Sequence, residues 1–177
     1  MTHKLKLLGG LALLLGALPL AQAHVHLQTP TATIGSSYKA ILEVGHGCDG
    51  SDTTRIRVQI PEGVVAVKPQ LKAGWQIETK DGAYAQPETL HGAKIDHGVR
   101  EISWTGLLPE AFYDEFSFVG TIASSLKPGQ TLYFPVVQEC KKGVSRWIDT
   151  TGKAGVGNPA PSVKLEKAQG HHGAHSH

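Results

Sequence analysis

The sequence has little that would build a helix or a long membrane span. No segment keeps a 3.6-residue apolar period, and the one long apolar stretch runs from Leu7 to Leu18. That stretch is shorter than the ~20 residues needed to cross a bilayer. Together with the basic residues before it and the small residues at 21 and 23, it predicts a secretory signal peptide over residues 1–23. We therefore expect a periplasmic or secreted protein with no membrane span after cleavage.

An excess of basic charge is also missing. Once Lys4 and Lys6 leave with the signal, 15 of the 17 Lys and Arg residues remain, against 15 Asp and Glu. This balance lacks the basic footprint of a nucleic-acid-binding protein, so no nucleic-acid partner is expected. Removal of 23 residues from a chain of 177 leaves 154, which is enough for one domain with a hydrophobic core.

Sulfur is scarce. Met1 is the only methionine and belongs to the signal, and Cys48 and Cys140 are too far apart in sequence to form a CxxC metal pair. Because soft sulfur ligands are lacking, a dedicated Cu(I) site is not expected. An even number of cysteines in an oxidising compartment predicts instead a disulfide between these two.

Short segments with period-two alternation make up most of the mature chain. In residues 54–61, Ile56 and Val58 face one side while Arg55 and Arg57 face the other. Many such segments, separated by Pro and Gly turns, predict an all-β fold: one immunoglobulin-like or cupredoxin-like β-sandwich over residues 24–151. Strands are expected at 24–29, 38–44, 54–61, 64–67, 75–79, 100–105, 116–122, 131–137 and 145–148.

Two other regions are expected to lack regular structure. The polar segment around His91 and His97 is predicted to be an exposed loop. Residues 152–177 are rich in Gly, Pro, Ala, Lys and Ser and are predicted to form a flexible tail. The tail ends in a segment with four histidines, His171, His172, His175 and His177, which is typical of loose binding of Cu, Ni or Zn.

Cleavage after Ala23 would make His24 the first residue of the mature chain. An N-terminal histidine offers two nitrogen ligands, its α-amine and its ring Nδ1, which together can close a chelate ring on Cu(II). Since the α-amine titrates near pH 8 in peptides, its deprotonation at neutral pH costs little. The sequence therefore predicts a metal site that depends on where the signal is cut.

His26 leaves two further readings open. A free amine, two deprotonated backbone amides and a histidine in third place form a square-planar chelate for Cu(II) or Ni(II), and His24-Val25-His26 fits this pattern. Residues 24 and 26 of a strand also face the same side, so His26 could serve as an auxiliary imidazole ligand beside His24.

From His24 to about Asp149 the chain resembles the YcnI-like family of exported copper-binding proteins. The order of several stretches along the chain carries the resemblance, whereas each stretch alone is common in β proteins. The matching stretches are His24 to Leu27, Thr53-Thr54, Val58 to Val64, Val67 to Pro69, Gly74-Trp75, Phe112 to Phe118 and Arg146 to Asp149.

The resemblance implies a β-sandwich that binds one Cu(II) in a single-histidine brace. Carried over by position, His24 provides its amine and ring, Glu115 provides a carboxylate, and Trp147 lies over the metal. Nitrogen and oxygen ligands of this kind suit Cu(II). Many relatives end in a membrane helix, which this chain lacks, and the cysteine pair is absent from some of them.

The resemblance implies a non-enzymatic protein that traffics or buffers copper, with copper donor or acceptor proteins as partners. Two other classes stay open. N-terminal histidine braces also occur in oxidative enzymes of the polysaccharide monooxygenase type, which use a second histidine. A structural β-sandwich could also carry an incidental copper chelate at its N-terminus. A carboxylate ligand and a covering tryptophan disfavour oxidation chemistry, so we do not expect an enzyme.

Overall fold

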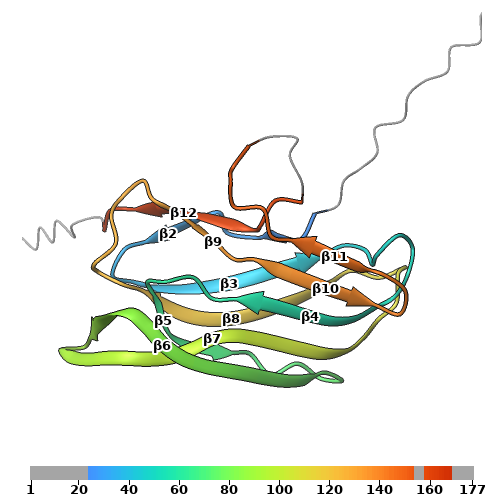
Figure 1. Cartoon of the computed structure of the whole chain (residues 1–177), viewed down its shortest axis with the longest axis horizontal. Helices are drawn as coiled ribbons and strands as arrows, with labels where there is room; N and C mark the ends of the chain where they lie inside the picture. The colour runs from blue at the N-terminus through green and yellow to red at the C-terminus, as the bar shows by residue number, and fades with distance from the viewer. Residues whose placement is uncertain (1–23, 154–157, 169–177) are drawn as a thin grey trace, which may run out of the picture.

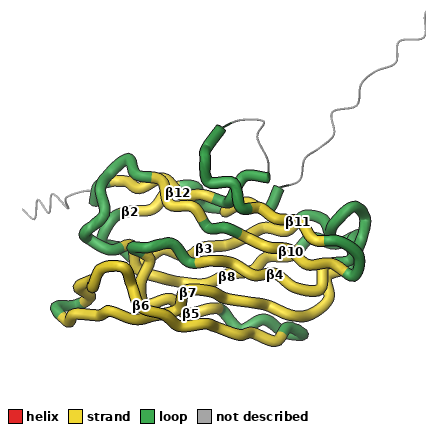
Figure 2. Tube along the Cα trace, in the orientation of Figure 1, coloured by secondary structure: helices red, strands yellow, loops and turns green. Residues whose placement is uncertain are grey.

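A computed structural model describes residues 24–153 and 158–168. The predicted signal peptide and the four C-terminal histidines lie outside the described residues. Within the described part every regular element is a β-strand, as Figure 2 shows, and no helix there is long and apolar enough to cross a membrane. The strands are β1 His26–Leu27, β2 Thr31–Thr33, β3 Ser37–Val44, β4 Thr53–Gln59, β5 Val64–Pro69, β6 Gln76–Leu90, β7 Ala93–Leu108, β8 Asp114–Ile122, β9 Thr131–Tyr133, β10 Val136–Cys140, β11 Val144–Trp147 and β12 Ser162–Glu166.

The strands form three sheets that share one core (Figure 1). The first sheet has the order β1-β3-β8-β5, the second β11-β10-β4-β7-β6, and the third, smaller one β2-β12-β9. Pairing is antiparallel throughout the first two sheets, whereas β12 runs parallel to β2. The predicted all-β sandwich is therefore confirmed.

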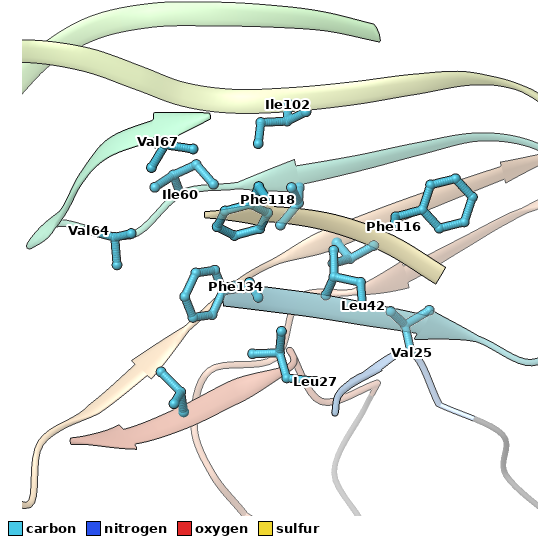
Figure 3. Close-up of a cluster of buried hydrophobic side chains, with 14 of the residues drawn as sticks. Val25, Leu27, Leu42, Ile60, Val64, Val67, Ile102, Phe116, Phe118 and Phe134 are labelled. Atoms are coloured by element: carbon cyan, nitrogen blue, oxygen red, sulfur yellow. The ribbon is translucent and has the colours of Figure 1, made fainter. Parts of the chain in front are cut away.

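Alternating side chains fill the space between the sheets. On β3, Tyr38, Ala40, Leu42 and Val44 are buried while the residues between them face outward, and on β4 Ile56 and Val58 are buried as predicted. Figure 3 shows Leu42, Phe116, Phe118 and Phe134 converging in this core. Across the sandwich the Trp104 ring of β7 meets the Phe116 ring of β8 edge-on, with centroids 5.6 Å apart. Such aromatic packing stabilises the face-to-face arrangement of the two larger sheets.

The hairpin of β6 and β7 is longer than the sequence predicted. Its strands contain 15 and 16 residues, and their outer halves pair only with each other. The expected loop is therefore wrong for His97, which lies on β7, whereas His91 lies in the turn between the strands with a φ of 49°, and both residues are exposed as predicted. Since these outer halves are mostly exposed, they lack the apolar alternation that indicates a strand in sequence.

Part of the predicted flexible tail is a core strand. β12 lies between β2 and β9, and its residues Val163 and Leu165 are 0% and 1% exposed. The expected tail over 152–177 is therefore wrong for Ser162–Glu166. The alternation of this short strand was hidden by its Pro- and Lys-rich surroundings, and its pairing partners lie more than a hundred residues earlier and about thirty residues earlier in the chain.

Truncation of a β12 core residue should therefore destabilise the whole domain. We expect Leu165→Ala to lower the free energy of unfolding by about 2–5 kcal/mol, because the removed methyl groups leave a cavity in a fully buried site. Equilibrium urea unfolding measures this loss. Lys164→Ala on the exposed face of the same strand is the control and should change stability by less than about 0.5 kcal/mol. Equal stabilities of the Leu165 variant and the unmodified protein would contradict the placement of β12.

The predicted disulfide is also confirmed. Cys48 and Cys140 are bonded, with Cα atoms 5.9 Å apart, and no cysteine of the described chain is free. The bond ties the loop after β3 to the end of β10. Because β3 belongs to the first sheet and β10 to the second, the bond links the two sheets at one end of the sandwich.

Candidate functional site

A row of polar residues crosses the outer face of the first sheet. His26 of β1 pairs with Glu43 of β3, and Glu43 pairs in turn with Glu115 of β8. The alternation of each strand directs the residues on either side, such as Leu42 and Phe116, into the core. Cross-strand partners share a face, so these three side chains project outward from neighbouring strands.

Hydrogen bonds join the members of this row. The His26 ring Nε2 lies 2.5 Å from Glu43 Oε2. The hydroxyl of Tyr113, in the loop before β8, donates to Glu115 and reaches Glu43 Oε1 at 3.4 Å. Two carboxylates placed directly opposite each other repel, and the shared hydroxyl offsets part of that repulsion. We name His26, Glu43, Tyr113 and Glu115 the acidic row.

The pKa of Tyr113 agrees with this role as a donor. Its hydrogen bond to Glu115, aided by partial desolvation and by the charges of Glu115 and Glu43, raises the pKa of Tyr113 well above its usual range. The hydroxyl therefore keeps its proton at neutral pH and remains a donor. As a result, the two carboxylates are held side by side without a basic residue between them.

A lysine fixes the start of β8, where Glu115 lies. Lys72 Nζ is 2.6 Å from Asp114 Oδ1 and donates to the backbone carbonyl of Glu115 at 2.9 Å. The Lys72 ammonium also lies 4.9 Å from the centroid of the Phe116 ring. These contacts fix the backbone at the start of β8, so the position of Glu115 does not depend on the pairing with β3 alone.

His24 lies at the beginning of the described chain and contacts Trp147 of β11. Its ring meets the Trp147 ring edge-on, with centroids 5.3 Å apart and an interplanar angle of 68°. Val25 is 2% exposed and anchors the segment in the core, which directs the side chain of residue 24 away from the core interior. Trp147 itself is only 7% exposed and belongs to the hydrophobic core.

The predicted ligands thus occupy two adjacent groups. His24 is in contact with Trp147, whereas Glu115 belongs to the acidic row together with His26. His26 engages both of its ring nitrogens with oxygen atoms, Nδ1 with the His24 carbonyl at 3.0 Å and Nε2 with Glu43. To act as an auxiliary metal ligand, His26 would have to release one of these contacts.

Side chains alone do not assemble a metal site in the described residues. No group of three or more His, Cys, Asp or Glu residues there has the arrangement to hold a metal ion. A metal bound next to Trp147 would therefore have to draw on something besides side chains. The free α-amine that cleavage before His24 would create is such a donor, and it adds a second nitrogen without a second histidine.

Two members of the acidic row were not singled out from the sequence. Glu43 is the penultimate residue of the alternating segment 38–44, and Tyr113 precedes Glu115 by two residues within a stretch that carried the family resemblance. A polar residue on the outer side of a strand is common, so neither carried a signal by itself. Their importance comes from the register of β3 against β8, which brings together residues about seventy positions apart.

Comparison with known proteins supports the fold and gives the family. An uncharacterized protein from Nocardia farcinica, whose crystal structure is described as immunoglobulin-like, superposes with a TM-score of 0.59 at 20% sequence identity. The superposition covers 81% of this chain and 98% of that chain. A comparison with curated proteins finds no match. The family model DUF1775, a domain of unknown function, matches residues 24–165, which include β12, and the chain therefore belongs to the DUF1775 family.

Proposed function

We propose that this protein is an exported Cu(II)-binding protein of the YcnI-like type, which traffics or buffers one copper ion per domain. The observation that carries the proposal is the contact of His24 with Trp147; the His24 carbonyl also meets the ring of His26, which belongs to the acidic row that contains Glu115. The DUF1775 match begins at residue 24, where the predicted mature chain begins, which supports a role for His24 as the first residue.

The available donors suit Cu(II). The α-amine and ring of His24 would supply two nitrogens and Glu115 an oxygen, and Cu(II) favours tetragonal sets of such ligands. Trp147 would restrict access from the side of the core, because its ring already packs against His24. Tyr113 holds the Glu115 carboxylate in place by donating to it.

Copper is cargo rather than a catalytic cofactor in this proposal. Oxidative enzymes with a histidine brace use a second histidine, and here the candidate auxiliary ligand, His26, is engaged with Glu43 and the His24 carbonyl. The disulfide supports an oxidising location such as the periplasm or the exterior. Partners would be proteins that deliver copper to His24 or accept it from there.

The ligand role of Glu115 can be separated from the charge of the row. In protein that begins at His24 and lacks residues 170–177, we expect Glu115→Gln to weaken Cu(II) binding about tenfold, or roughly 1.4 kcal/mol, because an anionic oxygen ligand is lost. Titration against a competing chelator, followed by electron paramagnetic resonance, measures the affinity and the ligand set. Glu43→Gln is the matched control, since it removes the same charge from the opposite position of the row.

We expect the two variants to differ in their electron paramagnetic resonance spectra. Glu115→Gln should change the copper hyperfine pattern, whereas Glu43→Gln should leave it unchanged and shift the affinity by less than about threefold. Equal effects of both variants would mean that the row acts only through its total charge, and Glu115 would then not be a ligand.

A further inference from the structure

We propose that Gln138 is a positioning residue, which holds the Trp147 indole in the orientation that supports His24. This inference deepens the proposed copper site and rests on it for its functional meaning. It identifies a residue that acts on the site through its hydrogen bond with the Trp147 indole.

Gln138 is a buried amide at a position where an apolar residue would be ordinary. It faces the core from β10, next to the fully buried Val136, and its own exposure is 0%. All of its polar atoms are satisfied: the Trp147 indole Nε1 donates to Oε1 at 3.1 Å, and Nε2 donates to the His46 carbonyl at 2.6 Å and to Thr53 Oγ1 at 2.8 Å. A buried amide with three partners is fixed in one orientation.

The two buried tryptophans of the sandwich are held differently. Trp104 is fully buried, and within the described residues its indole Nε1 has no hydrogen-bond partner, so packing alone holds it. Trp147 lies on β11, which is the edge strand of its sheet, and it contacts the residue that begins the described chain. At the edge of a sheet, packing covers fewer sides of the Trp147 ring than in the centre. The hydrogen bond from the indole to the fixed Gln138 oxygen therefore selects one orientation of the ring.

The acceptor is itself anchored by the disulfide region. Thr53 Oγ1 lies 3.8 Å from Cys140 Sγ, and Cys48 Sγ lies 3.6 Å from the Gln138 carbonyl. His46, whose carbonyl receives the amide, is two residues before Cys48. The contacts therefore run without a break from the disulfide through Gln138 and Trp147 to His24.

Gln138→Met tests the inference, because methionine keeps the length of the side chain but removes the amide. The first readout is the nuclear magnetic resonance spectrum of the metal-free full mature chain. There the Trp147 ring current should displace the His24 ring-proton signals, and Gln138→Met should move them toward their values in an unstructured peptide. The second readout is Cu(II) affinity, which we expect to fall about tenfold, as is common when the support of a metal ligand is removed.

Matched variants separate positioning from a general loss of packing. Ser103→Ala removes a buried polar group of a different network, a hydroxyl on the outer face of β7 that accepts from Arg55, and should leave both readouts unchanged. In a Trp147→Phe background, which has no indole N–H, the Gln138 substitution should cause no further change in either readout. If Gln138→Met does not fold, Thr53→Val removes one anchor of the same amide and should move the His24 signals in the same direction by a smaller amount.

The outcomes divide clearly. Unchanged His24 signals in Gln138→Met, or an equal effect with and without the indole N–H, would overturn the positioning role. If the signals move as expected but the unmodified protein shows no tight Cu(II) binding, the positioning of Trp147 stands and the proposed copper function fails. Movement of the signals together with weaker copper binding supports both.

Discussion

Protein with one extra alanine before His24 should lose tight Cu(II) binding, by about a thousandfold or roughly 4.1 kcal/mol. The added residue converts the α-amine of His24 into an amide, which removes one nitrogen and opens the chelate ring that amine and ring nitrogen form together. The loss is large because side chains alone do not assemble a metal site in the described residues. A Cu(II) titration of the extended and unextended proteins, both without residues 170–177, measures the difference.

The same titration with His26→Ala separates the brace from the alternative chelate. A chelate through two amides and His26 would require the amides of Val25 and His26 to lose their protons. Val25 is 2% exposed and His26 pairs with Glu43 of β3, so this chelate would have to detach the segment from the sandwich. We therefore expect His26→Ala to retain most of the affinity. Loss of binding in His26→Ala would favour the detached chelate, and equal binding with and without the extra alanine would exclude the terminal amine altogether.

The strands that could be predicted from the sequence are those in which apolar and polar residues alternate over several positions. In β4, Ile56 and Val58 alternate with arginines, and the burial pattern followed from the sequence directly. β12 gave no such signal, since its five residues follow a Pro-rich segment, and Val163 and Leu165 become core residues only through pairing with β2 and β9. Short strands that depend on distant partners carry too little local pattern to be recognised.

The candidate site shows the same division. His24 stood out because of its position after a predicted cleavage site, and Glu115 and Trp147 because of a family resemblance. Glu43 and Gln138 have ordinary surroundings in sequence, and their roles arise from the cross-strand contacts with Glu115 and Trp147. Register and side-chain hydrogen bonding are properties of the assembled sheets. The sequence could therefore point to the candidate ligands but not to the residues that support them.

Removal of the disulfide should cause a large loss of stability. Replacing Cys48 and Cys140 by alanine opens a link between residues 92 positions apart, and the chain-entropy relation assigns about 4–5 kcal/mol to a loop of that length. Equilibrium unfolding in urea should show this loss, together with a larger m value, because the denatured chain without its cross-link exposes more surface. The m value matters here, since it reports on the denatured state, where the cross-link acts in this account.

The disulfide variant also tests how far the polar network depends on the cross-link. Thr53 and His46, which anchor the Gln138 amide, lie within the region that the bond braces, so its removal should broaden the Trp147 indole signal in the folded protein. Leu165→Ala is the appropriate comparison, because it lowers stability from β12, in a different sheet from this network, and should leave that signal sharp. A loss below about 1 kcal/mol with an unchanged m value would contradict the entropic account. A sharp indole signal in the disulfide variant would instead show that the hydrogen bonds of Gln138 hold Trp147 without help from the covalent bond.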